Sequence, residues 1–288
     1  MQDISLRFFG VRGGTPISPR GNTKYGGNTP CIEIRADGRL IICDAGTGIR
    51  TLGDHLIAKG GKVSADILIS HIHWDHISGL PFFSPLYKKG TKVTIIAPRP
   101  EKLSLKSALA QVISPPYFPV SLTDVPATVR VCEAGVKPFK IGRTLITPFL
   151  LYHPGGALGW RFDFENGYRL AYVSDNEPVE NPEKLIAWVR GADILIHDAS
   201  FTPAEYKKHK GWGHSPYTYP VRLALAGGVK RLMLSHFNPA HTDRMIEKML
   251  QEAKNIISTS GLRLSCSLAS EGKVVKQCFS KQSHGKIC

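Results

Sequence analysis

The segment that most constrains this chain is a histidine-rich run directly after a short apolar strand. Residues Asp66–Ser70 have the composition of a buried strand, and the run His71–His76 follows without a break. It holds four potential metal ligands: His71, His73, Asp75 and His76. In extended or turning backbone the first two histidines point to the same side, and the next turn can carry the aspartate and the last histidine to an adjacent position. Imidazole and carboxylate suit zinc, manganese or iron, and the lack of cysteine argues against a closed structural zinc site. The run therefore predicts a metal site at a strand end.

Three further ligand-type residues lie where other predicted strands end: His153, Asp175 and His236. The strands that precede them are Thr144–Leu151, Tyr168–Val173 and Lys230–Leu234. Positions just beyond the carboxyl ends of strands commonly form the site in layered α/β folds. Any one of these residues alone would more often be structural. Four strand ends with ligand-type residues together favour one shared metal site.

Apolar patterns along the rest of the chain predict the fold class. Further strands are expected at Ile4–Phe9, Cys31–Ala36, Arg39–Asp44, Lys92–Ala97, Leu158–Phe164 and Asp193–His197. Helices are expected at Thr47–Ala58, Lys102–Ile113, Pro182–Arg190, Pro216–Ala226 and Thr242–Ile257. Strands come first and strand–helix alternation follows, twice over, which predicts two sheets with helices outside in a layered α/β domain. No long linker divides residues 1–277, and we expect residues 278–288 to be a disordered tail.

The net charge narrows the range of partners. Lys and Arg number 37 and Asp and Glu number 23, which gives +14. A field of this sign attracts anions and raises their association rate. Nucleic acid, nucleotides, phosphoesters and an anionic membrane surface are the candidates, and a contribution to solubility alone is the alternative.

The sequence favours a cytoplasmic protein. It has no run of about 18 apolar residues, so no membrane-spanning helix is expected. Its first residues lack the basic and apolar regions of a signal peptide. The six cysteines form no CxxC pair, as is typical of reduced thiols in a reducing compartment.

The chain resembles the metallo-β-lactamase-fold superfamily. The resemblance rests on Asp44–Gly48, on the His71–His76 run and on the three later ligand-type residues, and it covers roughly residues 4–277. It implies a four-layer αββα sandwich with two divalent metal ions in a cleft, zinc first and manganese or iron as alternatives. One ion would take His71, His73 and His153, and the other would take Asp75, His76 and His236. Asp175 would bridge the two ions together with a water or hydroxide. Unlike true β-lactamases of the superfamily, the chain has no cysteine at the bridging position.

A second pair of residues is similar to the phosphodiesterase branch of that superfamily. This branch includes transfer-RNA 3′-processing endonucleases and cyclic-nucleotide diesterases, in which an acidic residue supports a histidine. Asp198 and His214 match those two positions, with aspartate in place of the usual glutamate. A histidine oriented by a carboxylate can protonate a departing ribose oxygen or bind a phosphate oxygen. Asp75 would help to orient the attacking hydroxide while it binds metal.

Several functions remain open at this point. The first hypothesis is a two-metal phosphodiesterase acting on an anionic small molecule, most plausibly a 3′,5′-cyclic nucleotide. It is favoured because the sequence contains no obvious glycine- and proline-rich arm of the kind that grips transfer RNA. The alternative is a transfer-RNA 3′ endonuclease. A binding protein on an inactive hydrolase fold, and a thioester or lactone hydrolase, are less favoured. A homodimer is left open.

A few other residues carry weaker expectations. Arg12, Asn22 and Asn28, in a glycine-rich loop, either contact substrate or belong to a tight surface loop. His55, His209, His241 and His284 have no partner pattern and are expected at the surface. Pro115–Pro119 is either a lid that stacks on a base or an ordered loop packed under a helix.

Overall fold

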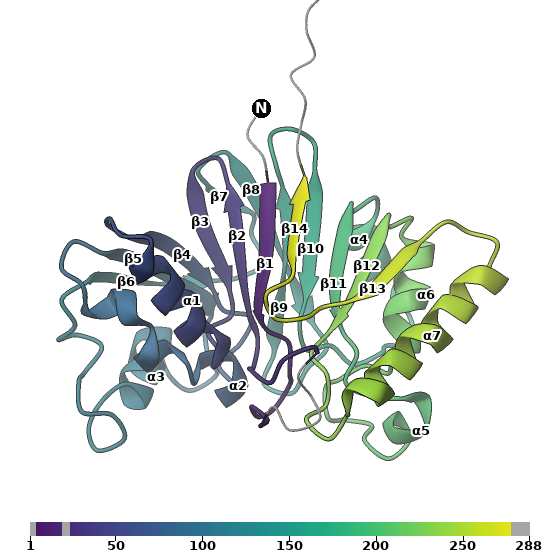
Figure 1. Ribbon diagram of the computed structural model, residues 1–288, viewed down its shortest axis with the longest axis horizontal. Coiled ribbons are helices and arrows are strands. Elements are labelled where there is room, and N and C mark those ends of the chain that lie inside the picture. The colour runs from purple at the N-terminus through teal and green to yellow at the C-terminus, as the bar shows by residue number, and fades with distance from the viewer. Residues whose placement is uncertain (1–3, 19–23, 278–288) are drawn as a thin grey trace, which may run out of the picture.

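Two seven-stranded sheets pack face to face between layers of helices in the computed structural model, which describes residues 4–18 and 24–277 (Figure 1). The first sheet, in spatial order, comprises β14 (Val274–Gln277), β1 (Ile4–Gly10), β2 (Cys31–Ala36), β3 (Arg39–Cys43), β4 (Ser64–Leu68), β5 (Lys92–Pro98) and β6 (Thr128–Ala134). The second comprises β13 (Ser265–Leu268), β12 (Arg231–Ser235), β11 (Ile194–Asp198), β10 (Arg169–Val173), β9 (Ala157–Asp163), β8 (Thr144–Leu151) and β7 (Phe139–Ile141). The predicted four-layer sandwich is confirmed.

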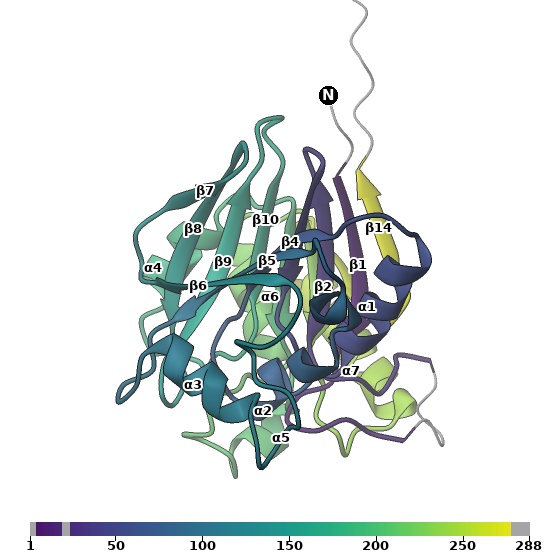
Figure 2. The same ribbon diagram turned by 90° about the vertical axis from the view of Figure 1, so that its left-hand side faces the viewer.

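Most of the helices cover the outer faces of the two sheets. The helices are α1 (Gly48–Ala58), α2 (Trp74–Ile77), α3 (Leu105–Val112), α4 (Glu183–Val189), α5 (Pro203–Tyr206), α6 (Thr218–Ala226) and α7 (Asp243–Thr259), with short 3₁₀ turns at Leu80–Phe82 and Ser84–Tyr87. α1 and α3 lie outside the first sheet, and α4, α6 and α7 lie outside the second (Figures 1 and 2). The short α2 and α5 lie at one edge of the sandwich (Figure 1). No helix in the described part of the chain combines the length and apolar character needed to cross a membrane.

Successive residues of the first sheet face opposite layers, because side chains alternate along a strand. Phe8 and Ile41 pack into the core between the sheets, in one cluster with Trp160 of the second sheet. Their neighbours Phe9 and Ile42 pack instead into the cluster formed with the outer helices. The sheet is therefore buried on both faces, which explains its apolar strands.

The strand directions place the predicted ligands at one edge of the sandwich. β3 to β6 run parallel to one another, and so do β10 to β13. The segments that follow β4, β10 and β12 therefore emerge at the carboxyl edges of the two sheets, which is where open α/β sheets carry their sites.

Some boundaries differ from those expected. β4 ends at Leu68, two residues before the predicted end, so the histidine run starts in a short connection. α3 begins at Leu105, because the Ser104 hydroxyl accepts a hydrogen bond from Ser107 N at 3.1 Å and caps the helix. Four strands were not predicted: β6, β7, β13 and β14. The expected tail, residues 278–288, lies outside the described residues.

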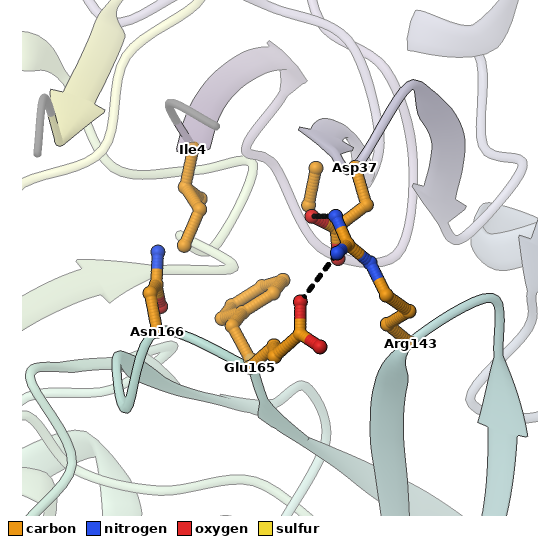
Figure 3. A pocket seen from close by; sticks show the side chains of 7 residues that line it. Ile4, Asp37, Arg143, Glu165 and Asn166 are labelled. Atoms are coloured by element: carbon orange, nitrogen blue, oxygen red, sulfur yellow. Dashed lines mark hydrogen bonds and ion pairs between the residues drawn. The ribbon is translucent and has the colours of Figure 1, made fainter. Parts of the chain in front are cut away.

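An arginine joins the two sheets at the end of the sandwich farthest from the ligands. Arg143, in the turn between β7 and β8, forms ion pairs with Asp37 in the β2–β3 turn at 2.9 Å and with Glu165 in the β9–β10 turn at 2.7 Å. These residues line a cavity of about 370 Å³ together with Ile4 and Asn166 (Figure 3). The hairpin tips of both sheets are thus held together here.

Candidate metal centre

Seven ligand-type side chains from both sheets meet at the carboxyl edge and form two groups. Within each group, the ligand atoms lie within 4.8 Å of one another. The first group is His71, His73, His153 and Asp175. The second is Asp75, His76, Asp175 and His236. Every residue singled out in the sequence as a metal ligand belongs to one of these groups, and Asp175 belongs to both.

Asp175 turns one carboxylate oxygen toward each group. Its Oδ2 lies 3.6 Å from His71 Nε2 and 3.8 Å from His153 Nε2. Its Oδ1 lies 3.3 Å from His76 Nε2 and 3.1 Å from His236 Nε2. This is the arrangement of a ligand shared between two neighbouring cation positions.

The histidine run divides between the groups because its backbone changes direction. His73 is extended and stands just before the single turn α2, and its Nδ1 lies 3.0 Å from His153 Nε2. Asp75 and His76 lie within that turn and face the second group, with Asp75 Oδ2 at 3.2 Å from His76 Nε2. A four-residue helix is therefore enough to direct adjacent ligands to two positions.

The glycine-rich loop after β1 closes over the second group. His236 has a φ of +56°, which is uncommon for a residue with a side chain. Gly13 lies against its ring so closely that a Cβ at position 13 would stand 2.3 Å from His236 Cε1. The next residue, Gly14, donates its N–H to Asp75 Oδ2 at 2.7 Å. A glycine is required at position 13 for this close approach.

The donor set fits divalent cations. Among the described residues, the buried His71 Nε2 and His76 Nε2 make no hydrogen bond, although both lie among carboxylate oxygens. Burial lowers the pKa of His71 well below its usual value, which favours the neutral imidazole, the form that binds metal. Burial opposes charge on His76 as well, but Asp175, Asp75 and Asp44 outweigh it and raise the pKa of His76 well above its usual value. Ring nitrogens that make no hydrogen bond, gathered around a shared carboxylate, leave places for cations.

A buried aspartate that the sequence analysis did not assign a role orients one of the rings. Asp44 Oδ2 lies 2.9 Å from His76 Nδ1 and accepts a hydrogen bond from the Tyr172 hydroxyl at 2.6 Å. Asp44 Oδ1 accepts from Ser70 N at 2.6 Å. Because Tyr172 belongs to the second sheet and Asp44 follows β3 of the first, this contact joins the two halves directly behind the ligands. Such outer carboxylates fix the ring orientation of metal-binding histidines.

Asp198 and His214 lie together beside the two groups. His214 Nδ1 is 3.2 Å from Asp198 Oδ2 and 3.8 Å from Asp175 Oδ2. Asp198 is fully buried and also accepts hydrogen bonds from Ser200 N at 2.8 Å and Ser215 N at 3.0 Å. Burial disfavours the charged imidazole, yet the carboxylates of Asp175 and Asp198 outweigh it and raise the pKa of His214 to about 9. The shorter aspartate side chain therefore still reaches the histidine.

A second carboxylate missed in the sequence is Glu177, two residues after Asp175. It is buried and accepts hydrogen bonds from Gly211 N at 2.7 Å, Gly213 N at 2.9 Å and the Tyr206 hydroxyl at 3.0 Å. Gly213 O in turn lies 2.9 Å from His153 Nδ1. Glu177 thus supports the ligand His153 through Gly213. In the sequence, the only sign of this role was the position of Glu177 just past the end of a strand.

Two of the weaker expectations are wrong. Arg12 contacts no open surface: it is fully buried and donates to Gly26 O at 2.9 Å and His241 O at 2.7 Å. His241 was expected at the surface but is also fully buried, with its Nε2 3.0 Å from Glu205 Oε1. Both residues hold together the loops behind His236.

Two further candidates lie away from the ligands or outside the described chain. The main-chain N–H of Asn28 donates to Glu271 at 2.6 Å, which pins the glycine-rich loop, and Asn22 lies outside the described residues. In the Pro115–Pro119 segment, the Phe118 ring packs on Phe82 at 5.6 Å, which favours the ordered loop.

Comparison with known proteins agrees with this geometry. A family model described as the beta-lactamase superfamily domain matches residues 39–237. Ribonuclease Z of Sulfurisphaera tokodaii is 27% identical, with 88% of this chain and 93% of that protein covered. The metallo-beta-lactamase fold protein YhfI from Bacillus subtilis superposes with a TM-score of 0.71 at 17% identity, covering 96% of this chain and all of that one. The short form of human tRNase Z superposes with a TM-score of 0.66 at 19% identity, covering 94% and 98%. Together with the two-sheet fold and its strand-end ligands, these matches show that the chain belongs to the metal-dependent hydrolases of the β-lactamase superfamily.

Proposed function

We propose that this chain is a two-metal endoribonuclease that cleaves a phosphodiester bond near the 3′ end of a transfer-RNA precursor. The observation that carries this proposal is the Asp198–His214 pair, whose histidine stands 3.8 Å from the shared ligand Asp175. When a phosphodiester bond is cleaved, the leaving group is a weakly acidic alcohol. Its oxygen needs a proton donor beside the cations. The relatives named ribonuclease Z support RNA as the substrate, and the net charge of +14 supports an anionic one.

The seven ligand-type residues would hold the two cations, for which zinc is our first choice. When bound, such cations neutralise phosphate oxygens and activate water. Asp75 Oδ2 is engaged by Gly14 N and His236 Nε2. Within the described residues its Oδ1 makes no hydrogen bond, so this oxygen would help to orient an attacking water.

His214 is the proposed proton donor. Asp198 holds its Nδ1, and the side chain keeps about one fifth of its surface exposed, so the ring can reach a bound substrate. Asp198 is in turn fixed by two main-chain N–H groups, which keeps its carboxylate in place as the proton moves. The histidine would protonate the departing ribose oxygen, and Asp198 would act only by orienting it.

A 3′,5′-cyclic nucleotide is the second candidate substrate. It is favoured by the short connections at residues 152–156 and 164–168, where the described chain carries no projecting arm between β8 and β10. A small diester would need no arm, because it fits within reach of the ligands. The chemistry assigned to His214 is the same for both substrates.

A substrate panel tests the proposal. The protein, stripped with chelator and reloaded with zinc or manganese, would be assayed on precursor transfer RNA, cyclic nucleotides, bis-p-nitrophenyl phosphate and nitrocefin. We expect a single cut in the precursor, about two metal ions per chain, and loss of both activity and metal in His73→Ala. If the protein cleaves cyclic nucleotides but not RNA, the second candidate substrate is the correct one. Turnover of nitrocefin with no phosphodiester cleaved would refute both.

A further inference from the structure

A basic, aromatic loop borders the first ligand group and is not used by the mechanism above. We call residues 207–213, which follow α5, the basic loop. Its lysines Lys207, Lys208 and Lys210 are exposed, and none has an ion-pair partner within residues 4–18 and 24–277. Trp212 is 60% exposed. Three unpaired cations and an open indole ring within six residues are the features that suit polyanions carrying planar rings.

The basic loop is held against the ligands by buried contacts. Glu177 accepts hydrogen bonds from both Gly211 N and Gly213 N, one on each side of Trp212. Gly213 has a φ of +82°, and a Cβ there would lie 2.2 Å from His153 Nδ1. The main chain on either side of Trp212 is therefore fixed, and its position relative to His153 is defined.

The rings behind Trp212 form a rigid support. Phe201 stacks on His209 with ring centroids 4.8 Å apart, and His209 meets Trp212 edge to face at 4.6 Å. Phe201 also lies 6.0 Å from the ring of His214. Trp212 is thus supported on one side and open on the other, and this chain of rings connects it to the proposed proton donor.

A cavity of about 420 Å³ separates the basic loop from the end of β8. Its walls include Leu150, Tyr152, His153, Glu177 and Gly211. Leu150 and Tyr152 are 62% and 63% exposed, so their side chains are open to a ligand in this cavity. A space of this size with apolar and aromatic walls can take a planar base next to a ligand of the metal centre.

We infer that the basic loop is the grip for single-stranded RNA next to the scissile phosphate, an inference that rests on the proposed function. The lysines would contact phosphates of the strand, Trp212 would stack on one base, and the cavity would take the neighbouring nucleotide. Because stacking and phosphate contacts are tolerant of sequence, the grip would select unpaired strands over duplex, and not one base over another.

Binding without cleavage tests this grip. We would measure the affinity for a fluorescent single-stranded RNA by anisotropy, with chelator present, as a function of salt. The binding constant falls as the salt concentration rises. The triple variant Lys207→Ala/Lys208→Ala/Lys210→Ala should make the plot of log binding constant against log salt concentration less steep by about 2, since each phosphate contact to a single strand contributes about 0.7 to the steepness. The matched control is Lys59→Ala/Lys62→Ala/Lys92→Ala, which removes the same charge from exposed lysines near the opposite end of the parallel strands.

The tryptophan has its own test. Trp212→Ala should weaken RNA binding about tenfold, whereas Trp212→Phe should keep most of the affinity because it retains a stacking surface. On the metal-loaded protein, kcat/KM should fall at least ten times more on RNA than on bis-p-nitrophenyl phosphate in the loop variants.

The outcomes separate this inference from the proposed function. Equal losses in the two lysine variants, or equal losses for Trp212→Ala and Trp212→Phe, would overturn the grip while cleavage of RNA by the unaltered protein still stood. If the unaltered protein cleaves cyclic nucleotides and neither binds nor cleaves RNA, the proposed function falls, and the grip falls with it.

Discussion

Replacing Glu177 by glutamine changes one atom and tests how the metal centre is supported. Glu177 Oε1 accepts hydrogen bonds from Gly211 N and the Tyr206 hydroxyl, and Oε2 accepts from Gly213 N at 2.9 Å. An amide has only one oxygen, so in Glu177→Gln at least one of these donors faces an N–H₂ group instead of an acceptor. If the oxygen stays with Gly211 and Tyr206, Gly213 N loses its partner inside the protein.

The expected cost follows from the kind of bond lost. A hydrogen bond to a charged group is worth about 1.5–3 kcal/mol. A loss of about 2 kcal/mol corresponds to a fall in Tm of about 3 °C for a domain of this size. Gly213 O positions His153 Nδ1, so metal affinity at the first group should also fall, by about 10- to 100-fold, as for other lost supports of metal-binding histidines.

Calorimetry and metal titration measure both effects. The control is Glu180→Gln, which removes the same charge from an exposed position three residues away. The reasoning is refuted if Glu177→Gln matches the control in both Tm and metal affinity. A lower Tm with unchanged metal affinity would limit Glu177 to a role in stability.

Other changes probe the remaining parts of the site. His214→Ala should lower kcat by about 100-fold or more on RNA but much less on p-nitrophenyl esters, whose leaving group barely needs a proton; equal losses would show that the residue binds phosphate instead. Asp198→Asn should show a weaker form of the same pattern with metal content intact. Asp44→Asn places an amide against Ser70 N, the Tyr172 hydroxyl and a ligand ring, so metal analysis should find binding weakened about 10- to 100-fold. Between low and physiological salt, kcat/KM on RNA should fall steeply while kcat changes little, and a flat profile would reduce the +14 charge to a solubility feature.

The parts of the site that could be predicted are those set by local sequence or by strand direction. The His71–His76 run carries its own geometry, because a single helical turn separates its ligands. His153, Asp175 and His236 could be grouped because each follows a strand, and strands that run in parallel end at the same edge.

What could not be predicted depends on contacts between distant parts of the chain. Glu177 acts through Gly213, 36 residues away, and the hydroxyl of Tyr172 reaches Asp44 across 128 positions. The edge strand β6 was missed because none of its residues is fully buried, so the pattern of a strand is weak. Arg12 has the appearance of a surface residue in sequence, and only the fold reveals the carbonyl groups that surround it.

Each of the two ligand groups contains residues from the first sheet and from the second. This arrangement affects the stability of the protein in the cell. Cations held there would cross-link two halves of the chain that also meet by apolar packing, by the hydrogen bond from Tyr172 to Asp44 and through Arg143 at the opposite end. A ligand that binds only the folded state adds about 2.7 kcal/mol to the free energy of unfolding when its free concentration is about 100 times its Kd. Metal starvation should therefore lower the stability of the protein as well as its activity. It should leave the halves open to proteases, so that the amount of the protein follows the supply of its metal.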